Sequence, residues 1–222
     1  CTQSSRAMKL VLVYPPFCTP TVPPHSITNL ASSISSNSDI EAKCLDLNAK
    51  FHRMRFPTLY SRLKKAGDSI NPYAEMLEKY SSSAKRVHRQ NNLKMAEGGV
   101  PELFNEMLDL VLKEAPDVVG LSFVYNSQIF YGMKLAEALD GAGIKCVAGG
   151  PAAGKTVAEN IPVLKDGKEL LRFLTGKDAP KEIYAPDFSQ YPECDYLSKE
   201  MTYPIRGSHG CSHRGCAFCT HH

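Results

Sequence analysis

The chain has 222 residues, of which 43% are hydrophobic and 22% are charged, enough apolar sequence for one domain or for one domain and a fragment of a second. Lysine and arginine number 26 against 23 for aspartate and glutamate, a balance too even for a nucleic-acid-binding surface. No apolar run approaches the roughly 18 residues of a membrane span, and no signal peptide precedes the first apolar segment. The sequence therefore predicts a cytoplasmic protein with neither nucleic-acid nor membrane partners.

Four apolar segments have the length and the flanking residues of buried parallel strands. These segments are Lys9–Tyr14, Ala42–Leu47, Asp117–Val124 and Ile144–Ala148. Val163–Leu164 is the candidate for a fifth, shorter element.

Helical patterns separate the predicted strands. Apolar residues recur at spacings of three and four in Val22–Asn37, Pro101–Ala115 and Gln128–Asp140, and a shorter helix is expected at Lys168–Thr175. The segment His52–Gly99 is too long for one crossover, which predicts an inserted helical excursion. Alternating strands and helices predict an α/β fold with a Rossmann-like, doubly wound parallel sheet.

The sequence changes in character after this domain. From Gly176 to Tyr203 the chain is rich in proline and tyrosine and has little periodicity, which is typical of a linker. The predicted organisation is a domain at residues 8–176, a linker at 177–203 and the start of a second domain at 204–222.

Residues typical of ligand-binding loops follow three of the predicted strands, at the edge of an open parallel sheet where ligands bind. The predicted cofactor-binding residues in these loops are Pro15, Pro16, Phe17, Thr19, Ser122, Phe123, Asn126, Gly149, Gly150 and Pro151. Two consecutive glycines allow a ligand to approach the backbone closely. The sequence therefore predicts that a bulky residue at Gly150 blocks the ligand without unfolding the domain.

The same glycines belong to a competing motif. The stretch "GGPAAGKT", Gly149–Thr156, fits the phosphate-loop pattern G-x-x-x-x-G-K-[ST] and follows a strand. Such a loop feeds a substantial helix, but Pro162 leaves at most about two helical turns after Lys155. A phosphate-loop nucleotide hydrolase therefore stays open as the less favoured alternative function.

Three cysteines, Cys211, Cys216 and Cys219, lie within nine positions in the spacing C-x4-C-x2-C. Thiolates this close in sequence can converge on one metal centre. Zinc needs a closed set of four ligands, and the fourth would be a nearby histidine at an unfamiliar spacing. An iron–sulfur cluster can be held by three thiolates that leave one iron open, so the spacing favours a cluster. A non-catalytic zinc or cobalamin carrier module remains a further alternative.

Several stretches together resemble one family, the cobalamin-dependent radical S-adenosylmethionine enzymes. "LVYPPF", "CLDLN" and "DVVGLSFVYNS" resemble the first three strands of its cobalamin-binding domain, and "VAGGPAA" is similar to the glycine pair that closes the fourth. "APDFSQYP" resembles the interdomain linker, and "YPIRGSHGCSHRGCAFC" resembles the entry to the barrel. The resemblance covers Met8 to His222.

The resemblance implies a cobalamin-binding Rossmann-like domain, a linker and the first part of a truncated TIM-like barrel. It implies that Cys211, Cys216 and Cys219 ligate a 4Fe-4S cluster whose open iron binds S-adenosylmethionine. The implied reaction is radical methyl transfer from methylcobalamin to an unactivated carbon or phosphorus of a small-molecule or peptide substrate. Flavodoxin or ferredoxin would be the electron donor.

Two features depart from the family pattern. The family's cysteine spacing is C-x3-C-x2-C, whereas this chain has one more residue between Cys211 and Cys216. Almost all of the barrel is missing, so we expect this chain to be a fragment or a truncated homologue that is inactive alone.

Overall fold

A computed structural model describes residues 6–65, 70–178, 184–198, 200–206, 213 and 215. Four parallel strands form one sheet in the order β2-β1-β3-β4. Their bounds are β1 Lys9–Tyr14, β2 Glu41–Asp46, β3 Val118–Ser122 and β4 Lys145–Gly149. The four predicted strands are confirmed, and the fold is α/β, compatible with a Rossmann-like arrangement. The expected fifth element is reduced to one parallel bridge between Ala148 and Val163.

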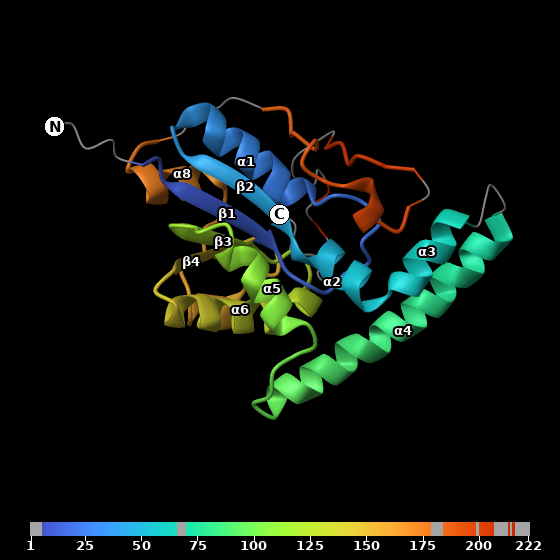
Figure 1. Ribbon diagram of the computed structural model, residues 1–222. Helices are drawn as coiled ribbons and strands as arrows, with labels where there is room; N and C mark the ends of the chain where they lie inside the picture. Colours follow the sequence, from blue (N-terminus) through green and yellow to red (C-terminus); the bar gives the residue numbers. More distant parts are fainter. Residues whose placement is uncertain are drawn as a thin grey trace.

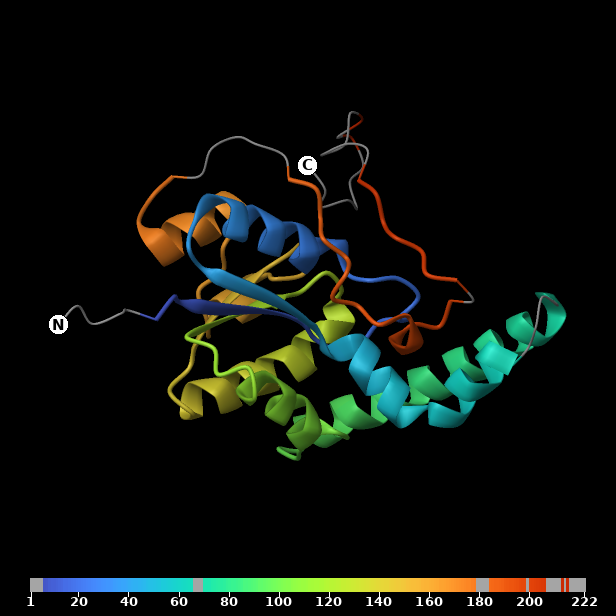
Figure 2. The same ribbon diagram turned by 45° about the horizontal axis from the view of Figure 1, so that its top comes forward.

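Helices cover both faces of this sheet (Figures 1 and 2). The helices are α1 His25–Asn37, α2 Leu47–Arg55, α3 Pro57–Lys65, α4 Ile70–Ala96, α5 Phe104–Leu112, α6 Ile129–Gly141, α7 Lys155–Ala158 and α8 Gly167–Thr175, with short 3-10 turns η1 Asn126–Gln128 and η2 Glu193–Asp195. Helices α1 and α8 lie on one face, and α5 and α6 lie on the other (Figure 1). The predicted excursion between β2 and β3 is helical, and its α4 extends with α3 away from the sheet (Figure 1).

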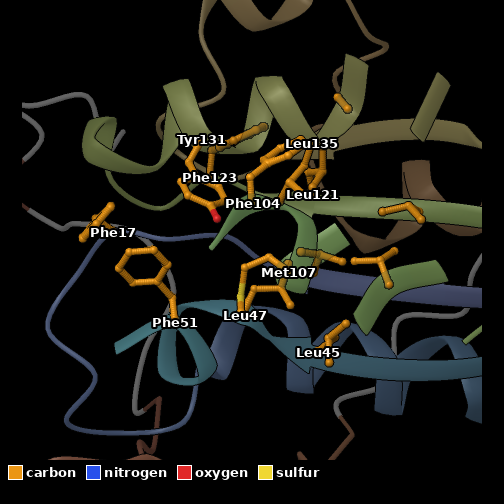
Figure 3. Close-up of a cluster of buried hydrophobic side chains, with 14 of the residues drawn as sticks. Phe17, Leu45, Leu47, Phe51, Phe104, Met107, Leu121, Phe123, Tyr131 and Leu135 are labelled. Carbon is orange, nitrogen blue, oxygen red and sulfur yellow. The ribbon is translucent and has the colours of Figure 1, made fainter. Parts of the chain in front are cut away.

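The sheet is buried on both faces, which explains why its strands are continuous apolar runs. Along β1, Val11 and Val13 belong to the core beneath α5 and α6, and Leu10 and Leu12 belong to the core beneath α1 and α8. Figure 3 shows the first of these cores, where Leu121 of β3 lies with side chains from α5 and α6. Each fully buried aliphatic side chain contributes about 1.5–3 kcal/mol.

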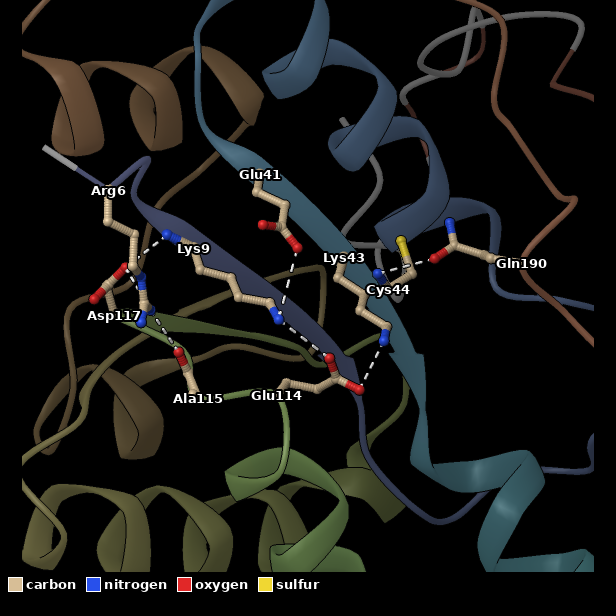
Figure 4. A network of polar contacts seen from close by, with 9 residues as sticks. All are labelled: Arg6, Lys9, Glu41, Lys43, Cys44, Glu114, Ala115, Asp117 and Gln190. Carbon is tan, nitrogen blue, oxygen red and sulfur yellow. Dashed lines mark hydrogen bonds and ion pairs between the residues drawn. The ribbon is translucent and has the colours of Figure 1, made fainter. Parts of the chain in front are cut away.

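Charged residues hold the amino-terminal edge of the sheet together (Figure 4). The Lys9 ammonium lies 3.6 Å from Glu41 and 3.4 Å from Glu114, which also pairs with Lys43 at 2.7 Å. The hydrogen bond from Lys43 lowers the pKa of the Glu114 carboxyl. The backbone N–H of Lys9 donates to Asp117 just before β3, at 2.7 Å. These contacts link the amino-terminal ends of the strands. The cavities described below lie at the opposite, carboxyl-terminal edge.

The predicted linker has little regular structure but packs against the sheet domain. The Tyr196 hydroxyl donates to the buried Asp46 carboxylate at 2.9 Å, and the Leu197 N–H donates to the Pro20 carbonyl at 2.8 Å. Asp195 is 4% exposed and pairs with Lys50 of α2. Residues 184–198 are therefore anchored beside the loop that follows β1. In the described segments we find no helix with the length and apolarity to cross a bilayer.

Candidate functional site

A cavity of about 340 Å³ lies between α1, α8 and the carboxyl-terminal halves of β3 and β4, and we name it the α1 cavity. Residues of its wall that bear on ligand binding are Leu12, Ser26, Gly120, Ser122, Gly149 and Gly150. Four of its nineteen lining residues are glycines, namely Gly120, Gly149, Gly150 and Gly167, so part of the wall is backbone.

Gly120, Gly149 and Gly150 occupy positions where a side chain would collide. A Cβ at Gly120 would lie 2.7 Å from Leu12 Cδ2, and one at Gly149 would lie 3.1 Å from the Leu164 carbonyl oxygen. Gly150 has φ +102°, and its Cβ would lie 2.4 Å from the Phe123 carbonyl oxygen. The prediction that a bulky residue at Gly150 spares the fold is therefore wrong, because the backbone itself requires glycine there.

The polar residues of the α1 cavity include Ser122 at the end of β3 and His25, Ser26 and Asn29 of α1, and its charged residues are Lys165, Asp166 and Arg206. Ser122 is 6% exposed, and its hydroxyl lies 3.0 Å from the hydroxyl of Ser26. Each hydroxyl can donate and accept, so the pair can reorient toward a ligand. At the rim, burial and the nearby Arg206 lower the pKa of His25, so this imidazole is neutral near pH 7.

The structure distributes the ten predicted cofactor-binding residues over several environments. Ser122, Gly149 and Gly150 line the α1 cavity. Phe17 and Thr19 line a second cavity beside α4. The remaining five line neither cavity: Pro15, Pro16 and Phe123 are buried, and Asn126 and Pro151 are exposed. All ten lie near the expected edge, but the structure brings only three of them together in the α1 cavity.

Sequence reasoning missed Ser26 and Gly120. Gly120 interrupts the apolar run "DVVGLSFV", and an isolated glycine within a strand is a signal of close approach by another group. Ser26 lies in the first turn of α1, and no local pattern distinguishes it from the other serines of that helix.

The phosphate-loop interpretation gains no support. The helix that follows Gly154 is α7, which has only four residues, too short to direct a row of backbone N–H groups at a phosphate. The Lys155 side chain is 91% exposed and lies 4.0 Å from Glu159. The segment is a glycine-rich turn with a solvated lysine.

The three clustered cysteines, Cys211, Cys216 and Cys219, lie outside the described residues. Within the residues that are described, no group of three or more His, Cys, Asp or Glu side chains could hold a metal ion. The described cysteines Cys18, Cys44, Cys146 and Cys194 are free. Burial raises the pKa of Cys18 to about 12 and those of Cys44 and Cys146 to about 11, so these three are unreactive thiols at neutral pH.

No known protein-family model and no curated protein sequence matches this chain. Its function is therefore argued from the α1 cavity and from the motifs of the sequence.

Proposed function

We propose that this chain is the cobalamin-binding part of a radical S-adenosylmethionine enzyme that transfers a methyl group to an unactivated carbon or phosphorus of its substrate. One observation carries the proposal: the glycine-walled α1 cavity opens at the carboxyl-terminal edge of a parallel sheet. This edge is where α/β folds of this type bind their ligands.

The α1 cavity suits the benzimidazole tail of cobalamin, which is a flat, largely apolar group with one unsubstituted ring nitrogen. Gly120 and Gly149 let the Leu12 side chain and the Leu164 carbonyl pack close to the strands, and the room for the ligand is the cavity between these strands, α1 and α8. Leu12 and Val147 supply the apolar contact area, and the Ser122 hydroxyl is a hydrogen-bond partner on the floor. The corrin would then lie over the three predicted loops at Pro15–Thr19, Ser122–Asn126 and Gly149–Pro151.

The iron–sulfur part of the proposal rests on the resemblance of Tyr203–Cys219 to the family's cluster loop. Cys211, Cys216 and Cys219 would ligate a 4Fe-4S cluster that binds S-adenosylmethionine and accepts electrons from flavodoxin or ferredoxin. When bound, these groups and methylcobalamin supply the radical and methyl-transfer chemistry. The sheet domain's own contribution is to hold the tail in the α1 cavity, to orient the corrin and to exclude water from its buried side.

The cobalamin proposal is tested by titrating the full chain with hydroxocobalamin and measuring bound cofactor by equilibrium dialysis. Replacing Ser26 with phenylalanine fills the α1 cavity from α1, so Ser26→Phe is expected to weaken binding by at least about tenfold. Ser35→Phe is the matched control, because Ser35 is an exposed serine of the same helix and does not line the cavity. Equal binding by both variants would refute the assignment.

The cluster proposal is tested separately by reconstituting the chain with iron and sulfide without oxygen. We expect oxygen-sensitive iron and sulfide that are lost in Cys216→Ala and retained in Cys194→Ala, a control at a cysteine outside the cluster loop. Stoichiometric zinc that survives air and disappears with Cys216 would show a zinc carrier module instead.

A further inference from the structure

A second and larger cavity, of about 600 Å³, lies on the other side of the sheet, and we name it the α4 cavity. Its wall comes from the loop after β1, from α2, from η1 and the start of α6, and above all from α4. The α4 cavity and the α1 cavity share no lining residue. Its volume is within the range of sites that bind small metabolites.

Helix α4 presents two adjacent rows of side chains to this cavity, at the spacing of four that marks one helix face. The rows are Tyr80, Ala84, His88 and Asn92, and Ser81, Lys85, Arg89 and Leu93. Opposite them, Phe17 stacks on the His88 ring with centroids 5.1 Å apart. Leu93 is 55% exposed and Phe130 is 56% exposed although both line the cavity. A bound apolar group would remove these two side chains from water.

The charges of the α4 cavity have one sign. Lys85 and Arg89 lie in its wall, and no aspartate or glutamate is among the described residues that line it. Burial lowers the pKa of His88, so this ring adds no charge near neutral pH. A cavity with two cations and no lining carboxylate favours an anion.

A buried polar atom without a partner lies in the same wall. His52 is 1% exposed, and its Nδ1 lies 2.8 Å from the Tyr80 hydroxyl. Its Nε2 has no hydrogen-bond partner among the described residues. Burial lowers the pKa of His52 to about 3, so the ring is neutral and Nε2 has one donor or acceptor to offer. Buried polar atoms in native proteins almost always have a partner, so this ring nitrogen is an exception next to the cavity.

We propose that the α4 cavity binds an amphipathic organic anion of metabolite size. Its apolar body lies against Phe17 and Phe130, and its carboxylate or phosphate lies near Lys85 and Arg89. The proposal does not depend on binding of the cobalamin tail, because the α1 and α4 cavities share no lining residue, although the loop with Phe17 and Thr19 borders both the α4 cavity and the proposed corrin position.

The probe for this site is 2-naphthoate, and its neutral analogue is 2-naphthalenemethanol. The chain contains no tryptophan, so the fluorescence of a naphthalene probe can be followed with little protein background. We expect 2-naphthoate to bind about tenfold more tightly than the alcohol, because only the carboxylate can form charge-assisted hydrogen bonds with Lys85 and Arg89. Absence of saturable naphthoate binding, or equal affinity for both probes, overturns the proposal.

Substituting two exposed cations of α4 tests whether their charge is needed for naphthoate binding, and substituting two other cations of the same helix is the control. The double change Lys85→Ala and Arg89→Ala is expected to weaken naphthoate binding by about tenfold and to leave the alcohol within about twofold. The matched double change Lys79→Ala and Arg86→Ala removes the same charges from the same helix outside the cavity. An equal loss of naphthoate affinity in both double variants would mean that the anion responds to the overall positive charge of α4 rather than to a specific site, and would overturn the proposal.

Neighbouring serines of α4 provide the steric test. Ser81 lines the cavity, so Ser81→Phe is expected to weaken binding of both probes by at least about tenfold. Ser82 is exposed and lies outside the wall, so Ser82→Phe is expected to bind both probes normally. The same two variants titrated with hydroxocobalamin separate this site from the α1 cavity: cobalamin loss in both would point to misfolding, and naphthoate loss in Ser81→Phe alone supports the proposal.

Discussion

The α1 cavity and the α4 cavity open at the same edge of one sheet but have walls of different kinds. Gly120, Gly149 and Gly150 make the α1 cavity a feature of the backbone, next to strands buried on both faces. The α4 cavity is bounded mainly by side chains of an inserted helix. The strand part of the first wall therefore tolerates few substitutions, whereas the chemistry of the second cavity can change by substitution on one helix face without altering the sheet.

The largest expected effect on stability comes from replacing a glycine in the wall of the α1 cavity. Gly150→Val is predicted to lower the free energy of unfolding by about 3 kcal/mol or more, because a β-branched residue at φ +102° is strained and its Cβ meets the Phe123 carbonyl. Gly154→Ala is the control, since its φ is −84° and the nearest atom to the new Cβ is 4.0 Å away. Urea unfolding measures both, and equal stabilities would contradict the backbone assignment.

Two buried tyrosines, one on each face of the sheet, allow the cost of losing a hydroxyl to be compared between the faces. Tyr80→Phe removes the hydroxyl at His52 Nδ1 and leaves both ring nitrogens without a partner among the described residues, at a cost of about 1–3 kcal/mol. On the other face, Tyr191→Phe removes a hydrogen bond between the Tyr191 and Thr28 hydroxyls. The cost is smaller, about 0.5–1.5 kcal/mol, because the Thr28 hydroxyl still donates to the Pro24 carbonyl at 2.7 Å. Urea denaturation should rank Tyr80→Phe as the less stable variant, and the reverse order would exclude a structural role for the Tyr80–His52 bond.

The smallest expected effect concerns pH. Burial raises the pKa of Asp46 from 3.8 to about 6, so the folded protein binds a proton that the unfolded chain releases, and stability falls as pH rises from about 4 to 6. His52 has the opposite sign. Its pKa is lowered from 6.5 to about 3, so the unfolded chain binds the extra proton and stability rises with pH over that interval. The two contributions offset each other.

Asp46→Asn removes the contribution of Asp46 to the pH dependence of stability and leaves the opposite contribution of His52. We expect the unfolding free energy of this variant to rise with pH between about 4 and 6, by about 1 kcal/mol per pH unit relative to the unchanged chain. Urea unfolding at a series of pH values measures this slope. The exposed Asp39→Asn is the control and should run parallel to the unchanged chain. Parallel behaviour of Asp46→Asn as well would count against the titration assigned to Asp46.

The strands were predictable because β1 and β3 are buried on both faces and are continuous apolar runs, whereas the edge strand β2 is buried only over its second half, Cys44–Asp46. Helix α4 was harder to delimit within the segment His52–Gly99. Its apolar residues Tyr73, Met76, Tyr80, Ala84 and Val87 recur at helical spacing and pack on the core, but the polar tract Ser81–Asn92 weakens this pattern in the sequence.

The candidate site was predictable only to the level of the sheet edge. Residues after a strand can turn toward either face, and the sequence does not say which. Phe17 follows β1 and Ser122 ends β3, yet Phe17 lines the α4 cavity and Ser122 lines the α1 cavity. The anchoring of the linker depends on single side-chain contacts such as Tyr196 to Asp46, which leave no periodic signal.

Helix α4 has 27 residues, and at 1.5 Å per residue it is about 40 Å long. Its lining residues run from Tyr80 to Ala96, and the part before Tyr80 extends with α3 away from the sheet (Figure 2). Because hydrogen bonds make the helix one stiff rod, its lining residues move together when the rod tilts. A rigid-body tilt of α4 would therefore change the width of the α4 cavity. A partner that bound the distant, amino-terminal part of α4 could cause such a tilt without contacting the cavity.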